Sequence, residues 1–223
     1  MLGAKQAILA IAVLTLGLGT ALAGHGVYLA AKARLAQALL SHAWEQTRRT
    51  GTPHRPWPWA DTRPVARLRV PRYGIDEIVL AGSSGRTLAF GPGLVPGTSL
   101  PGGSGLSMIS GHRDTHFQFL EDLRVGDVLY IQRAGQRTEA AYRYVVTRFM
   151  TIDLRKSVPA LDPTADQLVL VTCYPFHQWT AGGPGRYLVI ARPDPQRHRR
   201  YRSRDIVHAG PAHPDRASNS PGT

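Results

Sequence analysis

Three residues of this sequence combine types and an order that suit acyl transfer: His112, Cys173 and Arg186. Cys173 is the only cysteine of the chain and follows the apolar run LVLVT, whereas Arg186 directly precedes the run YLVIA. If these runs form antiparallel strands, the cysteine and the arginine fall at the same end of a sheet. A cation held near a thiol favours the thiolate and can later stabilise an oxyanion, which are the two requirements of an acyl-transferring cysteine.

His112 lies in ISGHRDTH, where a polar stretch follows an apolar run and a side chain can project into a cleft. Two other interpretations stay open at this point. A single cysteine at a strand end is often only a small buried hydrophobe. Alternatively, His112 and His116 could bind a metal with Cys173 as the third ligand, although no glutamate lies between the histidines and no second cysteine completes a structural site.

Short apolar runs typical of strands must position these residues. The alternating segment ARLRVPRYGIDEIVLAG predicts two strands joined by a turn at residues 72–74. A helical turn is expected around 117–123, and further strands are predicted at 125–132, 141–149, 167–172 and 187–191. Because no sustained βαβ alternation is present, the pattern predicts an all-β domain, either an antiparallel barrel or a sandwich.

The segment 83–110 is rich in glycine and proline and leads directly into the stretch that contains His112. It is longer than structureless loops usually are in compact domains, and such loops are often functional. We expect it to form a wall of a binding groove, with a mobile surface loop as the alternative.

The amino-terminal segment 6–31 contains no Lys, Arg, Asp or Glu. As a helix it is long enough to cross a hydrocarbon core of about 30 Å. The triplet Ala21-Leu22-Ala23 also fits a signal-peptide cleavage site, but the apolar run continues past it to Leu29, which favours an uncleaved anchor. In both cases the remainder of the chain is expected to be exported.

Four regions are predicted along the chain. Residues 1–31 form the membrane anchor or signal segment, and residues 32–64 form a juxtamembrane helix, with Leu35, Leu39 and Leu40 on one face, and a proline-rich extended linker. A catalytic barrel follows over 65–193, and 194–223 is a basic disordered tail. The formal net charge of +12 owes much to the ends of the chain, and no nucleic-acid motif accompanies it, so no nucleic-acid partner is expected.

The ordered set GLSMISGHRDTHFQFLEDLRVGD, LVLVTCYPF and GRYLVIA resembles the sortases, cysteine transpeptidases of cell-surface proteins. The resemblance covers residues 66–193 and implies an eight-stranded β-barrel with short helices, behind a transmembrane helix. It also implies a catalytic triad of His112, Cys173 and Arg186. Thr172 and Leu170 match the family's T-L-x-T-C motif, although Val169 replaces its first threonine; Leu106 stands where many relatives have asparagine.

The mechanism that the resemblance implies needs neither a metal nor a cofactor. The Cys173 thiolate attacks the amide carbonyl between Thr and Gly of an LPxTG-like sorting motif, and Arg186 stabilises the oxyanion. His112 protonates the leaving amine, and a thioacyl-enzyme forms. An amine acceptor of the cell envelope then resolves this intermediate, with Thr172 expected to contribute a hydrogen bond near the substrate.

The HRDTHF and TCYPF strings are most similar to those of Gram-negative, marine proteobacterial sortases, each paired with one dedicated target. That subclass implies a surface-protein partner with VIT and von Willebrand A type domains and a C-terminal sorting signal. It also implies a single-pass protein of the inner (cytoplasmic) membrane, with its catalytic domain on the periplasmic side. The alternatives are a housekeeping or pilus-type Gram-positive sortase, or a non-catalytic exported binding barrel in which Cys173 is inert.

Overall fold

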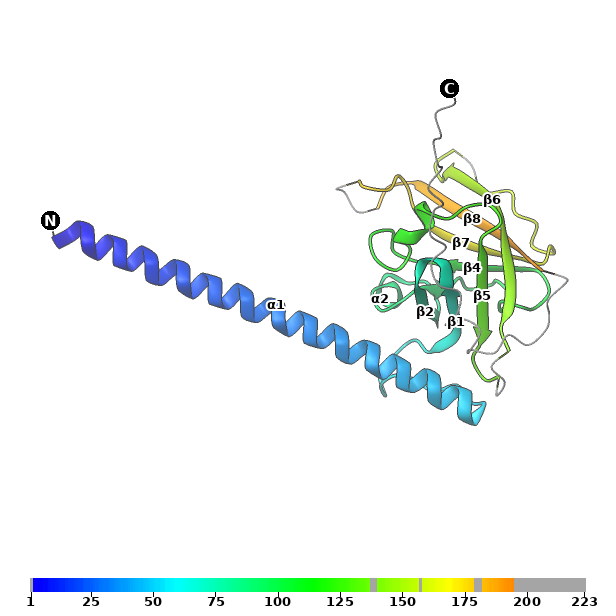
Figure 1. Cartoon of the computed structure of the whole chain (residues 1–223), viewed down its shortest axis with the longest axis horizontal. Coiled ribbons are helices and arrows are strands. Elements are labelled where there is room, and N and C mark those ends of the chain that lie inside the picture. Colours follow the sequence, from blue (N-terminus) through cyan, green and yellow to red (C-terminus); the bar gives the residue numbers. More distant parts are fainter. Residues whose placement is uncertain (1, 137–139, 157, 179–181, 195–223) are drawn as a thin grey trace, which may run out of the picture. The chain divides into compact units, whose positions relative to one another are not determined.

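The described part of the chain begins with one long helix. In the computed structural model, which describes residues 2–136, 140–156, 158–178 and 182–194, α1 runs without interruption over Leu2–Thr50 (Figure 1). The sequence predicts a membrane segment and then a separate juxtamembrane helix, but no proline lies between them and the two are continuous. An 18-residue window of α1 has a mean hydropathy of 2.1, so this helix is a candidate membrane span.

The last turns of α1 belong to the second of two compact units, Leu40–Thr223, whereas the first unit is Met1–Leu39. Within the second unit, one face of the helix is buried at the spacing i, i+3, i+4 and i+7: Leu40, Ala43, Trp44 and Thr47. The helix ends where Gly51 adopts a φ of +79° and its N–H donates to the carbonyl of Thr47 at 2.9 Å. Of the three leucines expected on one face, Leu40 is buried and Leu35 is exposed.

The proline-rich stretch 51–63 contains no helix, as predicted, and it is partly buried. Thr62 donates its hydroxyl proton to the carbonyl of Ala81 at 2.8 Å. The ring of Trp57 meets the ring of Phe90 edge-on, with the centroids 5.2 Å apart. This stretch is therefore fixed to the unit that contains the strands.

Eight strands of the described chain close into a barrel, which confirms the predicted fold class (Figure 1). Their bounds are β1 Pro64–Val70, β2 Ile75–Ala81, β3 Gly93–Leu94, β4 Leu106–Ser110, β5 Val128–Arg133, β6 Tyr142–Asp153, β7 Gln167–Cys173 and β8 Gly185–Pro193. Around the barrel they follow the order β1-β2-β3-β4-β7-β8-β6-β5, and β5 pairs with β1 to close it.

Two of the strand pairings differ from the antiparallel arrangement expected from sequence. β2 pairs with β3 in parallel, and β4 pairs with β7 in parallel over five residue pairs that end at Ser110 opposite Val171. The second pairing needs the whole of β5 and β6 as its connection, and such long-range pairing leaves no local pattern in the sequence. It matters for function because it brings the end of β4 beside the end of β7.

The strands bury apolar side chains on both faces. An inner cluster fills the barrel with side chains from most of its strands, among them Leu68, Ile109, Leu129, Val146, Leu168, Leu170 and Val189. An outer cluster is built by the alternate residues: Val169, Leu188 and Ile190 are buried, and Leu106, Met108, Met150, Ile152, Leu161 and Val171 pack against them. Burial on both faces explains the nearly continuous apolar sequence of β7.

Short helices occupy the connections. The predicted turn at 72–74 contains the 3-10 helix η1, Pro71–Tyr73, and the predicted helical turn near 117–123 contains the 3-10 helix η2, Gln118–Glu121. The glycine- and proline-rich segment 83–110 contains the helix α2, Gly85–Leu88, and the strands β3 and β4, so it is not a structureless loop. Of the predicted basic tail, residues 195–223 lie outside the described residues.

Candidate active site

Cys173 and Arg186 face each other across one strand pair. β7 and β8 are antiparallel, and their register places Cys173 directly opposite Arg186, as the sequence predicts. The backbone N–H of Tyr174 donates to the carbonyl of Gly185 at 3.0 Å, which continues the pairing to the strand ends. Cys173 is a free cysteine and is neither fully buried nor fully exposed. Cys173 is thus less enclosed than the fully buried residues of the same strand, such as Leu170.

The guanidinium of Arg186 is held by its own strand end. Its Nη1 donates to the carbonyls of Gly183 and Gly185, both at 2.7 Å. Within the described residues, Nε and Nη2 of Arg186 have no protein partner. Those donors are the ones that remain for a substrate carbonyl oxygen beside the thiol.

His112 is brought to the same edge by the parallel pair β4 and β7. After Ser110, the N–H of Gly111 donates to the carbonyl of Val171 at 3.1 Å, so the pairing extends one residue beyond β4. His112, the next residue, is exposed. A side chain at Gly111 would meet the ring of Phe117 at 2.7 Å, because the chain turns back there and the N–H of Phe117 donates to the carbonyl of His112. The structure thus brings the three predicted residues to one edge of the barrel.

Thr172 lies on the opposite face of β7 from Cys173. It is buried, and its hydroxyl donates to the carbonyl of Gly111 at 2.8 Å. This hydrogen bond ties β7 to the residue that precedes His112. Thr172 therefore acts on the site indirectly, by holding the backbone next to His112.

Arg113, which the sequence reasoning did not single out, is 4% exposed. Its guanidinium forms a fork with the carboxylate of Asp114, at 2.7 and 3.0 Å. The Asp114 carboxylate is the main cause of a raised pKa of Arg113, and the Cys173 side chain also raises it. In return, the hydrogen bonds from Arg113 lower the pKa of Asp114. In the sequence, Arg113 stands between His112 and Asp114. Such a run of polar residues is easily interpreted as a solvent-exposed turn.

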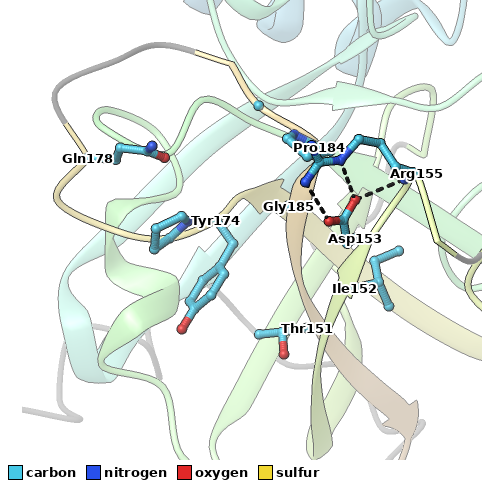
Figure 2. Close-up of a pocket in the computed structure, with 10 residues that line it drawn as sticks. Thr151, Ile152, Asp153, Arg155, Tyr174, Gln178, Pro184 and Gly185 are labelled. Atoms are coloured by element: carbon cyan, nitrogen blue, oxygen red, sulfur yellow. Dashed lines mark hydrogen bonds and ion pairs between the residues drawn. The ribbon is translucent and has the colours of Figure 1, made fainter.

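An open pocket of about 420 Å³ lies beside the Arg186 end of β8. Figure 2 shows Tyr174 on one side of it, and the ion pair of Asp153 and Arg155 next to Pro184 and Gly185 on the other. Arg155 lowers the pKa of Asp153 to about 2 through this contact. Rings also gather here: Tyr174 stacks with Tyr187 at 6.2 Å between centroids.

A second pocket, of about 450 Å³, lies beside the residues that follow His112 in the chain. Its lining includes acidic and histidine side chains. His116 contacts Glu77 through Nδ1 at 3.0 Å, and His177 contacts Glu121 through Nε2 at 2.9 Å. His116 is thus paired with a carboxylate of β2. In the described part of the chain, no group of three or more potential metal ligands is found, so the metal interpretation gains no support.

The comparisons with known proteins agree with this geometry. A family model described as a sortase domain matches residues 68–194. Sortase D of Bacillus subtilis (strain 168) is 29% identical over 125 residues, which are 56% of this chain and 61% of that protein. The chain therefore spans less than two thirds of the length of this relative.

Two solved structures have the same fold. Sortase A from Corynebacterium diphtheriae superposes with a TM-score of 0.51 and 30% identity, covering 62% of this chain and 66% of that one. Sortase C1 from Streptococcus agalactiae, solved as a complex with MTSET, gives a TM-score of 0.51 and 26% identity, covering 59% of this chain and 68% of that one.

Proposed function

This chain belongs to the sortase family of cysteine transpeptidases, and from that premise we propose that it cleaves an LPxTG-like sorting motif between Thr and Gly and transfers the acyl part to an amine. The observation that carries the proposal is the register that sets Cys173 opposite Arg186, at the edge that His112 also reaches. A nucleophile, an oxyanion stabiliser and a general acid are the groups that acyl transfer requires.

In the first half-reaction, Sγ of the Cys173 thiolate attacks the carbonyl carbon of the threonine. The carbonyl oxygen becomes an oxyanion, which Nε and Nη2 of Arg186 stabilise as hydrogen-bond donors. When the C–N bond breaks, His112 in its protonated form gives its proton to the leaving amine of glycine. The product is a thioacyl-enzyme on Cys173 and a neutral His112.

In the second half-reaction, an amine acceptor attacks the thioester carbonyl and loses a proton to His112. The C–S bond then breaks, and the thiolate of Cys173 and the imidazolium of His112 return to their initial state. Transfer competes with hydrolysis, so the amine has to attack the thioester carbonyl before water does. The same histidine handles the proton in both directions, first as general acid and then as general base.

The outer cluster supplies a binding surface for the apolar residues of the motif. Leu106 and Met108 of β4 and Val171 of β7 are partly buried and lead along their strands toward His112 and Cys173. Partly buried apolar side chains gain stabilisation when a Leu or Pro side chain covers them, by about 25 cal/mol per Å² of apolar area. We assign the Leu and Pro of the sorting motif to this surface.

The helix α1 is the proposed anchor of the enzyme in the inner (cytoplasmic) membrane, with the catalytic unit on the extracytoplasmic side. The proposed substrate is a surface protein with a C-terminal sorting signal. Similarity of the HRDTHF and TCYPF strings favours a dedicated target with VIT and von Willebrand A type domains. The proposed acceptor is an amine of the cell envelope.

The experiment that tests this function uses the full chain in detergent micelles with a library of LPxTG-type peptides and a small amine. Mass spectrometry measures the amine-containing exchange product. Cys173→Ala should abolish the product, His112→Ala should lower turnover at least about 10²-fold by removing the general acid, and Arg186→Ala should lower it about 10²- to 10³-fold by removing an oxyanion donor.

A matched Arg186→Lys variant separates charge from geometry, because lysine keeps the charge but loses the planar fork of donors. An exchange product that survives in Cys173→Ala would overturn the assignment of the nucleophile. An absent product with every peptide, together with a thiol that alkylates only after unfolding, would favour the inert binding barrel instead.

A further inference from the structure

Arg113 is a buried cation that the proposed triad does not use. It follows His112 in sequence, yet its side chain is directed at the loop that follows Cys173 rather than at solvent. A buried guanidinium loses most of its hydration and persists only where hydrogen bonds and an opposite charge replace it. Its contacts therefore indicate what the fold gains by keeping it.

Two of those contacts are backbone carbonyls of the loop 174–178. Nη1 donates to the carbonyl of Pro175 at 2.6 Å, and Nη2 donates to the carbonyl of Gln178 at 2.7 Å. These residues are two and five positions beyond the thiol. Arg113 consequently joins the segment that presents His112 to the segment that presents Cys173.

The same loop has other attachments. At its start, Tyr174 is bonded to Gly185, and any side chain at Gly185 would meet the Tyr174 carbonyl at 2.3 Å. In its middle, the ring of Phe176 meets the ring of Tyr187 edge-on, with the centroids 5.2 Å apart. Further along, His177 adopts a φ of +61° and pairs with Glu121. Arg113 adds hydrogen bonds from the residue next to His112 to the loop carbonyls on either side of Phe176 and His177.

The charge of Arg113 has a second consequence. Its carboxylate partner, Asp114, is 68% exposed, so water screens that negative charge, whereas the guanidinium itself is enclosed. Hydrogen bonds from an ionised donor are stronger than those from a neutral one, so the enclosed guanidinium holds the carbonyls of Pro175 and Gln178 firmly.

We propose that Arg113 is a positioning residue for the transpeptidation inferred above: its hydrogen bonds fix the loop 174–178 so that Cys173 faces His112. The proposal rests on the proposed function only for its effect on turnover. Its effect on the loop is independent of any substrate.

The test uses the full chain in detergent micelles and two substitutions that remove different properties. Arg113→Lys keeps the charge and loses the fork, whereas Arg113→Met keeps the apolar stem and loses the charge. Arg67→Met is the matched control, because Arg67 forms a similar two-point fork with Asp76, between β1 and β2. Thermal unfolding checks that each variant is folded.

Two quantities are measured. Hydrogen exchange of the backbone amides in the loop 174–178 reports how firmly the loop is held, and peptide-to-amine transfer gives kcat and KM separately. Arg113→Met and Arg113→Lys should each speed hydrogen exchange of this loop about tenfold or more relative to Arg67→Met. Each should lower kcat about tenfold or more, with KM changed less than about threefold, because the nucleophile is misplaced while the binding surface stays intact.

The proposal is overturned if folded Arg113→Met has the loop hydrogen exchange and the kcat of Arg67→Met. If Arg113→Met does not fold, Arg113→Lys decides: a kcat within twofold of wild type, with unchanged hydrogen exchange of the loop 174–178, would refute the positioning role. If the wild-type chain transfers no peptide at all, the proposed function fails, but hydrogen exchange of the loop still tests Arg113.

Discussion

The inner and outer faces of β4, β7 and β8 have different tasks although their residues alternate along the same strands. Inward-facing Leu168, Leu170 and Val189 are fully buried in the barrel. Outward-facing Val169 and Val171 lead to Cys173, and outward-facing Ile190 and Leu188 lead to Arg186. The period of two in a strand therefore separates side chains that fill the barrel from side chains on the face that carries Cys173 and Arg186.

Thr172 and Cys173 show how sharp this separation is. They are neighbours in sequence, but the hydroxyl of Thr172 is buried against Gly111, whereas the thiol of Cys173 lies at the accessible edge. A side chain on the inner face can affect catalysis only by moving the backbone. A side chain on the outer face can contact the substrate itself.

A cavity on the inner face should have the largest effect, and it tests the difference between the two faces directly. Leu170→Ala should destabilise the chain by about 2 to 5 kcal/mol, because it removes a fully buried side chain from the barrel core. Urea unfolding measures the change. Cys173→Ala is the matched outer-face variant, which should unfold within about 1 kcal/mol of wild type while its exchange activity is lost. Equal destabilisation by both substitutions would contradict the division between the faces.

Thr172→Val tests an inner-face residue that touches the site through the backbone. The substitution keeps the volume but leaves the carbonyl of Gly111 without its hydroxyl donor, at a cost of about 1 to 3 kcal/mol. Because the segment of His112 loosens, kcat should fall about three- to tenfold while KM changes little. Thr172→Ser, which restores the hydroxyl, should recover most of the kcat, and its failure to do so would point to packing of the methyl group instead.

Met108→Ala tests the outer face as a binding surface. Met108 is partly buried in the outer cluster, so its loss should cost less stability than a fully buried residue. We expect the KM for the sorting peptide to rise about three- to tenfold, because one side chain that contacts the peptide is lost. The kcat should stay within about twofold of wild type. A lower kcat with an unchanged KM would place the peptide elsewhere.

The smallest expected effect concerns the exposed carboxylate beside the site. Arg113 holds the pKa of Asp114 below its ordinary value, so this ion pair stabilises the folded chain above that ordinary value and is lost as the pH falls toward the folded-state pKa. Asp114→Asn should lower Tm by about 1 to 3 °C at pH 7, and the difference should shrink at an acidic pH below the ordinary pKa of an aspartate. Calorimetry at both pH values measures it, and a difference that grows toward low pH would have the wrong sign.

Local apolar runs and one short connection predict an all-β domain, the membrane-type helix and the pairing of Cys173 with Arg186. They leave a barrel and a sandwich open, and the resemblance to the sortases selects the barrel. The apolar runs do not predict the parallel pairing of β4 with β7, which is separated by two other strands. Arg113 is missed for a related reason. Its carbonyl partners, Pro175 and Gln178, lie far along the chain, and an HRD string resembles an exposed turn until those partners are known.

The continuous helix is a further case in which local pattern was insufficient. A change from apolar to mixed composition near residue 31 suggests two elements, but neither part contains a breaker, so one helix reaches Thr50. Trp44 is buried within the unit Leu40–Thr223. Only tertiary packing decides which face of such a helix is covered.

The measurement that tests the central claim most directly is the position of the acyl group. The full chain is mixed with an LPxTG-type peptide in the absence of an amine, quenched in acid, digested and sequenced by tandem mass spectrometry. The account predicts an adduct ending in the threonine acyl group on Cys173, which disappears on addition of an amine. An adduct on another residue, or rapid cleavage with Cys173 never modified, would contradict it.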